Sequence, residues 1–251
     1  MCHRLKKPST ASRNTIDRLK SGAVAALLIV GTTGTAWGQF LCSSDNQVAP
    51  AALAERFISA DCAFCWRQPV PVPKSASGLT LDWIVPGALG DEAPLSTAAN
   101  RDALVRLESL DLAAPQTQRL VHQVVDLPPE ISLRVAHGLV LGGYVGASIS
   151  LSFVKTTQTK LPLHAWLVLV EHLPAGTEGS PTPRILARNM LQPIWNIDSS
   201  LQNNVVYQET EMRPMNIPAG TNTANIGVVG WVSDHTGKIL VAAQSACSPD
   251  Q

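Results

Sequence analysis

The stretch Tyr144-Val-Gly-Ala-Ser-Ile-Ser-Leu-Ser-Phe-Val154 decides the fold class of the C-terminal half of the chain. Apolar residues occupy every second position, and small or polar residues stand between them. Successive side chains of a strand point to opposite faces, so this alternation predicts a strand with one buried and one exposed face. The residues expected to face the core are Val145, Ala147, Ile149, Leu151 and Phe153.

Further strand patterns surround this stretch after the break at Pro128-Pro129. They cover residues 131–137, 164–171, 184–195, 205–213, 225–233 and 238–246. The last two are joined by Asp234-His-Thr-Gly237, a sequence that favours a hairpin turn. Several strands at short intervals, with turn residues between them, predict a β-sandwich-like domain over residues 130–251.

The N-terminal half mixes strand and helix patterns. Residues 51–59 and 115–125 each fit a short helix or a strand, and periodicity does not decide between the two. Residues 79–85 are rich in apolar and aromatic side chains and predict a strand. Ser96 is a favourable helix cap, so a helix is expected over residues 97–110.

The first 38 residues have the pattern of a secretory signal peptide. Six basic residues precede the apolar run Ala23-Val-Ala-Ala-Leu-Leu-Ile-Val30, which is too short to cross a bilayer as a helix. Ala36 and Gly38 are small residues suited to positions −3 and −1 of a cleavage site after Gly38. An uncleaved N-terminal anchor is the alternative. No later segment has 18 continuous apolar residues, so no membrane span is expected after cleavage, and a periplasmic or secreted location is predicted.

The composition narrows the range of partners and cofactors. The chain has 19 basic and 19 acidic residues, and loss of residues 1–38 removes six basic residues and one acidic residue. The remaining 13 basic and 18 acidic residues give a net charge of −5. A dedicated nucleic-acid binder usually carries a basic surface, so no nucleic-acid partner is expected. The sequence has no Walker A motif, no G-x-G-x-x-G and no G-x-S-x-G, and no cofactor is expected.

Four cysteines remain after cleavage: Cys42, Cys62, Cys65 and Cys247. An even number of cysteines in an exported chain predicts disulfides. Four cysteines permit three pairings. The C-x-x-C spacing favours a local disulfide between Cys62 and Cys65, and this leaves Cys42 to pair with Cys247 near the other end of the chain.

The C-x-x-C segment has several chemical interpretations. A c-type haem requires His directly after the second cysteine, where this chain has Trp66. A zinc site requires two more ligands at suitable spacing, and the histidines are scattered singly, so no metal is expected. A redox-active dithiol and a structural disulfide both remain. The alternate prolines Pro69, Pro71 and Pro73 prevent a long helix after Cys65, which weakens the redox interpretation.

Several segments together resemble an uncharacterised family of secreted bacterial proteins. They are Phe57-Ile-Ser-Ala-Asp-Cys62-Ala-Phe-Cys65, Leu81-Asp82-Trp83, Ala165-Trp-Leu-Val-Leu-Val-Glu171, Arg184-Ile-Leu-Ala-Arg-Asn-Met190 and Gly227-Val-Val-Gly-Trp-Val-Ser-Asp234. The resemblance implies an α+β fold class, with a divergent thioredoxin-like part over residues 39–129 followed by a β-sandwich-like C-terminal domain. It also implies that Pro115 takes the place of the cis-proline that faces the dithiol in thioredoxin-like folds.

The function that this resemblance implies is thiol–disulfide exchange by an exported protein. Cys62 would form a mixed disulfide by exchange with a thiol or disulfide of a protein partner, and Cys65 would resolve the mixed disulfide. The alternative is a non-catalytic binding or structural module in which the Cys62–Cys65 disulfide is purely structural. Two departures from the family pattern favour this alternative: Asp61 replaces a glycine before the first cysteine, and Trp66 replaces a proline after the second.

Overall fold

The structure is a computed structural model that describes residues 42–69, 77–156, 162–193, 195 and 202–247. The fold of these residues consists mainly of β-strands. The signal peptide predicted for residues 1–38 lies outside these residues. The strands are β1 (Cys42–Ser43), β2 (Ala52–Ser59), β3 (Gly78–Val85), β4 (Gln118–Val124), β5 (Ile131–Leu141), β6 (Tyr144–Val154), β7 (His164–Leu173), β8 (Arg184–Leu191), β9 (Val206–Asn216), β10 (Ile226–Ser233), β11 (Ile239–Gln244) and β12 (Ala246–Cys247). The α-helices among the described residues are α1 (Ala63–Trp66) and α2 (Asp102–Ser109).

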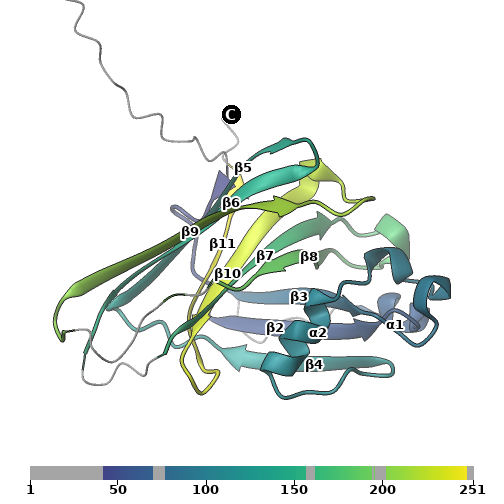
Figure 1. Cartoon of the computed structure of the whole chain (residues 1–251). Helices are drawn as coiled ribbons and strands as arrows, with labels where there is room; N and C mark the ends of the chain where they lie inside the picture. The colour runs from purple at the N-terminus through teal and green to yellow at the C-terminus, as the bar shows by residue number, and fades with distance from the viewer. Residues whose placement is uncertain (1–41, 70–76, 157–161, 194, 196–201, 248–251) are drawn as a thin grey trace, which may run out of the picture. The chain divides into compact units, whose positions relative to one another are not determined.

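The strands form two sheets. The five-stranded sheet has the order β12-β1-β5-β6-β9, and all of its neighbouring strands are antiparallel. The seven-stranded sheet has the order β11-β10-β7-β8-β3-β2-β4. It is mixed, because β2 and β8 both run parallel to β3 while its other pairs are antiparallel. Figure 1 shows the five-stranded sheet over β10 and β11, and α1 and α2 at the β2–β3–β4 end.

The main core lies between the two sheets. The alternating residues of β6 form one side of it, and all five residues that the alternation predicts to face inward are fully buried there. Apolar residues of β7, β10 and β11 form the other side, among them Leu167, Val228 and Val241. The pairing register of β6 is fixed by this alternation, because a shift of one residue would turn all of its apolar side chains to solvent.

A second core covers the outer face of the seven-stranded sheet. Ala103 and Leu107 of α2 pack there against Phe57 of β2 and Trp83 of β3, whose rings stack with centroids 6.1 Å apart. Residues on both faces of β2 are therefore buried, which explains why residues 51–59 do not alternate between apolar and polar side chains. The sequence left a helix and a strand open for this segment, and the structure shows the strand.

The predicted fold class is wrong in its N-terminal part. Residues 39–129 do not form a thioredoxin-like α/β unit, because α1 spans four residues and the chain is mostly strand. Instead β2, β3 and β4 extend the sheet that β7, β8, β10 and β11 form, and β1 joins the five-stranded sheet. The strands after residue 130 therefore do not make a separate sandwich. They share both sheets with strands from the N-terminal half.

Individual elements differ from their predictions less than the fold class does. The strand predicted at 144–154 is confirmed as β6, and the hairpin predicted at 234–237 is confirmed between β10 and β11. The helix predicted over 97–110 is wrong at its start. Ser96–Ala98 is a 3-10 turn, and α2 begins at Asp102, whose backbone N–H donates to the Asn100 side chain. No helix among the described residues is long and apolar enough to cross a membrane.

Candidate functional site

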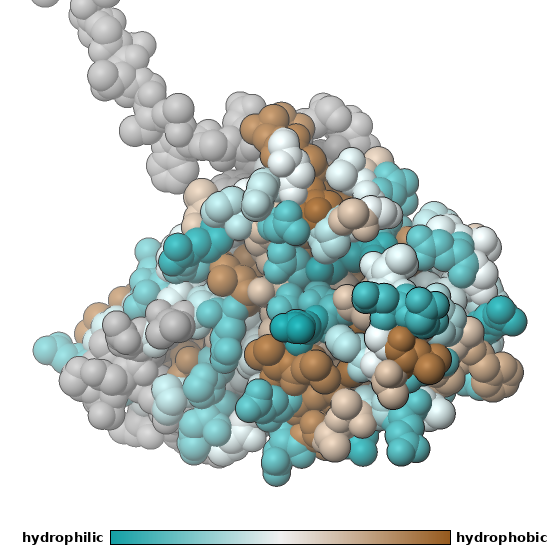
Figure 2. All heavy atoms as spheres, turned by 45° about the vertical axis from the view of Figure 1, so that its right-hand side comes forward, coloured by the Kyte–Doolittle hydropathy of each residue, from teal (hydrophilic) through white to brown (hydrophobic). Residues whose placement is uncertain are grey.

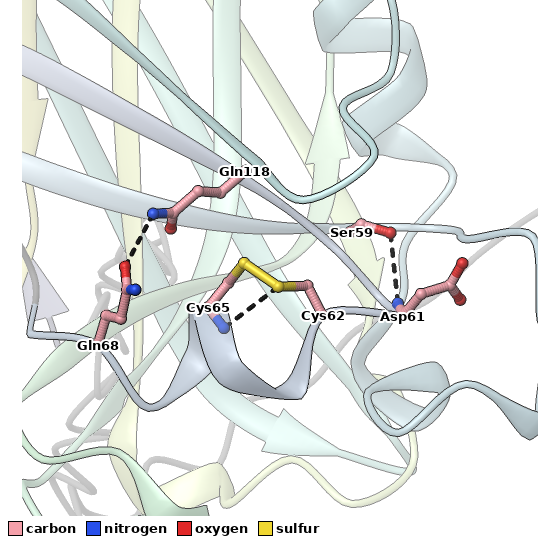
Figure 3. Close-up of a disulfide and its surroundings, with 6 residues drawn as sticks. All are labelled: Ser59, Asp61, Cys62, Cys65, Gln68 and Gln118. Carbon is pink, nitrogen blue, oxygen red and sulfur yellow. Dashed lines mark hydrogen bonds between the residues drawn. A yellow bond between two sulfur atoms is a disulfide. The ribbon is translucent and has the colours of Figure 1, made fainter.

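The C-x-x-C segment forms a tight turn at the end of β2. Cys62 precedes the single helical turn of α1, which contains Cys65, and a disulfide joins the two residues (Figure 3). The backbone N–H of Cys62 donates to the carbonyl of Ser59 at 2.9 Å, which closes the turn against the end of the strand. The disulfide is thus held at the end of a strand rather than on a long helix.

The two cysteines differ in their environments. Cys65 is 4% exposed and packs against Ile58, Trp66 and Ile84, whereas Cys62 is half-buried at the surface. The backbone N–H of Cys65 points at the sulfur of Cys62, with an N–Sγ distance of 3.3 Å. An N–H group in this position favours the thiolate form of Cys62 once the disulfide is reduced.

Asp61 anchors the N-terminal side of the turn. Its carboxylate accepts hydrogen bonds from the backbone N–H groups of Ala88 at 2.8 Å and Leu89 at 3.3 Å. Figure 3 shows this side chain directed away from the disulfide. A Cβ atom on Gly87 would lie 2.1 Å from an Asp61 oxygen, so the loop requires glycine there. The negative charge that the sequence places beside Cys62 is therefore used to hold a loop.

Arg184 of β8 anchors the C-terminal side of the turn. Its guanidinium lies over the ring of Trp66, 4.3 Å from the centroid, and donates to the carbonyls of Trp66 and Gln68. It also contacts the carboxylate of Asp82 at 3.0 Å. Because these groups are buried, the turn has little freedom to move relative to the sheet.

Asp82 links this anchor to the strand that carries the cysteines. Arg56 of β2 donates to both oxygens of Asp82, at 2.7 and 3.1 Å. One buried carboxylate therefore lies between two buried guanidiniums, those of Arg56 and Arg184. Burial raises the pKa of Asp82 to about 6 although the Arg56 guanidinium acts to lower it, so the ion pairs offset only part of the cost of removing this carboxylate from water.

The segment that contains Pro115 lies close to the start of the turn. Pro115 is half-buried in the loop before β4, and two residues later the carbonyl of Thr117 accepts a hydrogen bond of 2.7 Å from the Ser59 N–H. Gln118 donates to the side chain of Gln68 at 3.0 Å, beside the disulfide in Figure 3. This loop and the C-x-x-C turn thus form one surface.

Apolar residues flank the disulfide on that surface. Phe64, between the two cysteines, is 71% exposed, and Leu89 beside the Asp61 anchor is 56% exposed. A pocket of about 250 Å³ lies next to α1 and is lined by Trp66, Leu95 and Glu178, among others. Figure 2 brings this side of the molecule forward and shows apolar residues at several separate places among hydrophilic ones. Such a surface can contact a protein partner.

Cys42 and Cys247 form the second disulfide, far from the first along the sheets. They lie opposite each other on β1 and β12, and His137 lies opposite Cys42 on β5. The structure therefore has two separate cysteine sites, one at each disulfide. The segment after Pro115 lies near the first of them, since the carbonyl of Thr117 accepts a hydrogen bond from Ser59 at the end of β2.

Sequence reasoning missed the residues that hold these sites. Asp82 and Arg184 stand in segments that carry the family resemblance, but neither they nor Arg56 were predicted to hold the turn, because charged residues usually lie at the surface. A signal was present, since Glu55-Arg56 interrupts the middle of a strand that is otherwise apolar. His137 was treated as an isolated histidine, because only the pairing of β1 with β5 places it beside Cys42.

The chain was compared with protein-family models, curated proteins and solved structures, and none of them matches.

Proposed function

We propose that the chain is an exported protein that exchanges thiols and disulfides at Cys62 and Cys65, with a protein as partner. The observation that carries this proposal is the difference between the two cysteines. Cys62 is accessible and accepts an N–H from the turn, whereas Cys65 is buried behind it. Exchange requires one sulfur that a partner can reach and a second that resolves the mixed disulfide from within.

The reaction follows from this arrangement. The Cys62 thiolate attacks one sulfur of a partner disulfide, and the electron pair of that bond leaves on the other partner sulfur. The Cys65 thiolate then attacks Cys62, which releases the first partner sulfur as a thiolate and re-forms the Cys62–Cys65 disulfide. The partner disulfide is reduced and the Cys62–Cys65 dithiol is oxidised. Exposed Phe64 provides apolar contact for the partner chain.

The second candidate is a non-catalytic binding or structural module. It is favoured by the length of α1, which ends at Trp66, one residue after Cys65. A turn that is anchored by Asp61 and Arg184 can serve as a rigid surface without any exchange.

The reduction potential of the Cys62–Cys65 pair distinguishes the two candidates. Equilibration with glutathione or a dithiol buffer should give a value of about −120 to −270 mV for an exchange protein. Cys65→Ala should trap a mixed disulfide on Cys62 when treated with oxidised glutathione or 5,5′-dithiobis(2-nitrobenzoate), each of which releases its second half as a thiolate. The matched variant Cys62→Ala should trap much less, because Cys65 is buried. A potential below about −300 mV, with no adduct on Cys65→Ala, would establish the structural module instead.

Export is part of the same proposal and is supported by the pattern of residues 1–38. Expression of the full chain in a bacterium and N-terminal sequencing of the periplasmic protein should give Gln39 as the first residue. Retention of the full-length chain in the membrane fraction would indicate the uncleaved anchor.

A further inference from the structure

The cluster of Cys42, Cys247 and His137 has the arrangement of metal ligands. Residues that pair across neighbouring strands point to the same face of a sheet, and Cys42 pairs with both Cys247 and His137. One ring nitrogen of His137 and the two sulfur atoms all lie within 4.8 Å of one another. A metal ion bound to sulfur at about 2.3 Å and to nitrogen at about 2.0 Å needs ligand atoms close together in this way.

His137 has a nitrogen atom with no partner. Its Nδ1 lies 3.1 Å from the carbonyl of Gly138, which can only accept, so Nδ1 carries the proton of the neutral ring. Nε2 then has the lone pair, and it is buried with no hydrogen-bond partner among the described residues. The whole residue is 4% exposed. A histidine that binds a metal through one nitrogen usually donates its other N–H to such a carbonyl.

We propose that the reduced Cys42/Cys247 pair binds a zinc ion together with Nε2 of His137. Two thiolates balance the charge of the ion, and thiolate and imidazole ligands suit zinc. Cys247 and His172 line a cavity of about 450 Å³. Because Cys247 lines this cavity, a water molecule from it can complete the tetrahedron. This site is independent of the function proposed for Cys62 and Cys65.

The site forms when a dithiol reductant opens the disulfide. Cys247 is exposed, so a reductant thiolate attacks its sulfur, and the electron pair of the broken bond leaves on Cys42. The second thiol of the reductant then displaces Cys247 and forms a disulfide within the reductant. Binding of zinc to the two reduced cysteines releases their protons to solvent. The oxidised form cannot provide the thiolate ligands, so metal binding depends on redox state.

Cobalt and zinc titrations of the full chain test this proposal. Cys2, Cys62 and Cys65 are replaced by Ala, so that Cys42 and Cys247 are the remaining thiols. After reduction, addition of Co²⁺ should give a thiolate-to-metal charge-transfer band. Zinc should then displace the Co²⁺ in a 1:1 ratio and abolish the band. The oxidised form of the same protein should give no band. Zinc should also raise the melting temperature of the reduced protein.

Histidine variants decide whether the ligand set is correct. His137→Gln should weaken zinc binding more than tenfold, whereas His122→Gln, which changes an exposed histidine on β4, should leave it unchanged. The proposal is overturned if the charge-transfer band is absent, or if His137→Gln binds zinc as tightly as its parent. If the reduced chain unfolds, recovery of its native circular dichroism on addition of zinc supports the site, and failure to recover overturns it.

Discussion

Arg106 carries a buried charge in the core beneath α2. It forms a two-point ion pair with Glu55, at 2.6 and 2.9 Å, and its guanidinium lies about 5 Å from the rings of both Trp166 and Trp231. Glu55 also accepts a hydrogen bond from Trp83 at 3.2 Å. Both charged side chains are almost completely buried, so each is compensated by the other rather than by water.

Arg106→Met is therefore expected to lower the free energy of unfolding by about 3–5 kcal/mol, because it leaves the Glu55 carboxylate buried without its partner. Urea denaturation measures the loss. The control is the double variant Glu55→Gln/Arg106→Met, which removes both charges and keeps an acceptor for Trp83. It should be more stable than Arg106→Met alone. A double variant that loses the sum of both single losses would contradict this account.

His137 and His172 should make the oxidised protein less stable in mild acid. Burial lowers the pKa of both residues, and the charge of His137 lowers the pKa of His172 further. As the pH falls through about 6.5, the unfolded chain therefore binds more protons than the folded one. The stability that comes from the neutral rings is present above this pH and is lost as the pH falls towards the lower folded-state values.

Denaturation at about pH 7.5 and about pH 5.5 tests this expectation. The loss of stability on acidification should be smaller in His137→Gln than in the parent, and unchanged in the exposed-site variant His122→Gln. Identical losses in all three proteins would show that the buried ring does not contribute.

Gly230 allows strands of the two sheets to pack closely against each other. It lies on β10, and a Cβ atom there would come 2.6 Å from Val135 of β5 and 3.1 Å from Ile149 of β6. Gly230→Ala should cost about 1–3 kcal/mol in unfolding free energy, because the packed core must shift to admit a methyl group. Gly146→Ala is the matched control. Gly146 is exposed on β6 with nothing within 4 Å of its Cβ position, and the change should stay within about 0.5 kcal/mol. Equal effects at the two positions would contradict the packing argument.

The elements were predictable where one face of a strand is buried and the other is exposed. The alternation of β6 is such a case, because each apolar residue there faces the core between the sheets. The start of α2 was not predictable from Ser96. The side chain of Asn100 accepts the N–H of Asp102 instead, and Asn100 is held in place by hydrogen bonds from its backbone to Ile84 and from its side chain to Arg188. Both partners are distant in sequence.

The architecture of the whole molecule was less predictable than its strands. β3 pairs with β8 across a separation of about 100 residues, through Asp82 opposite Leu186, and this contact merges the two halves into one sheet. No local pattern marks such a pairing. The same reason applies to the candidate metal site. Cys42, His137 and Cys247 come from three strands that are distant in the sequence, so their spacing does not resemble a zinc motif.

The two disulfides should contribute unequally to the stability of the whole molecule. Cys42 and Cys247 are 205 residues apart, whereas Cys62 and Cys65 are three apart. In the chain-entropy model the long loop restricts the unfolded chain by about 5 kcal/mol and the short one by about 2 kcal/mol. Urea denaturation without reductant should therefore show a larger loss for Cys42→Ala/Cys247→Ala than for Cys62→Ala/Cys65→Ala. The reverse order would mean that the C-x-x-C disulfide stabilises the native turn itself, which would favour the structural module over an exchange site.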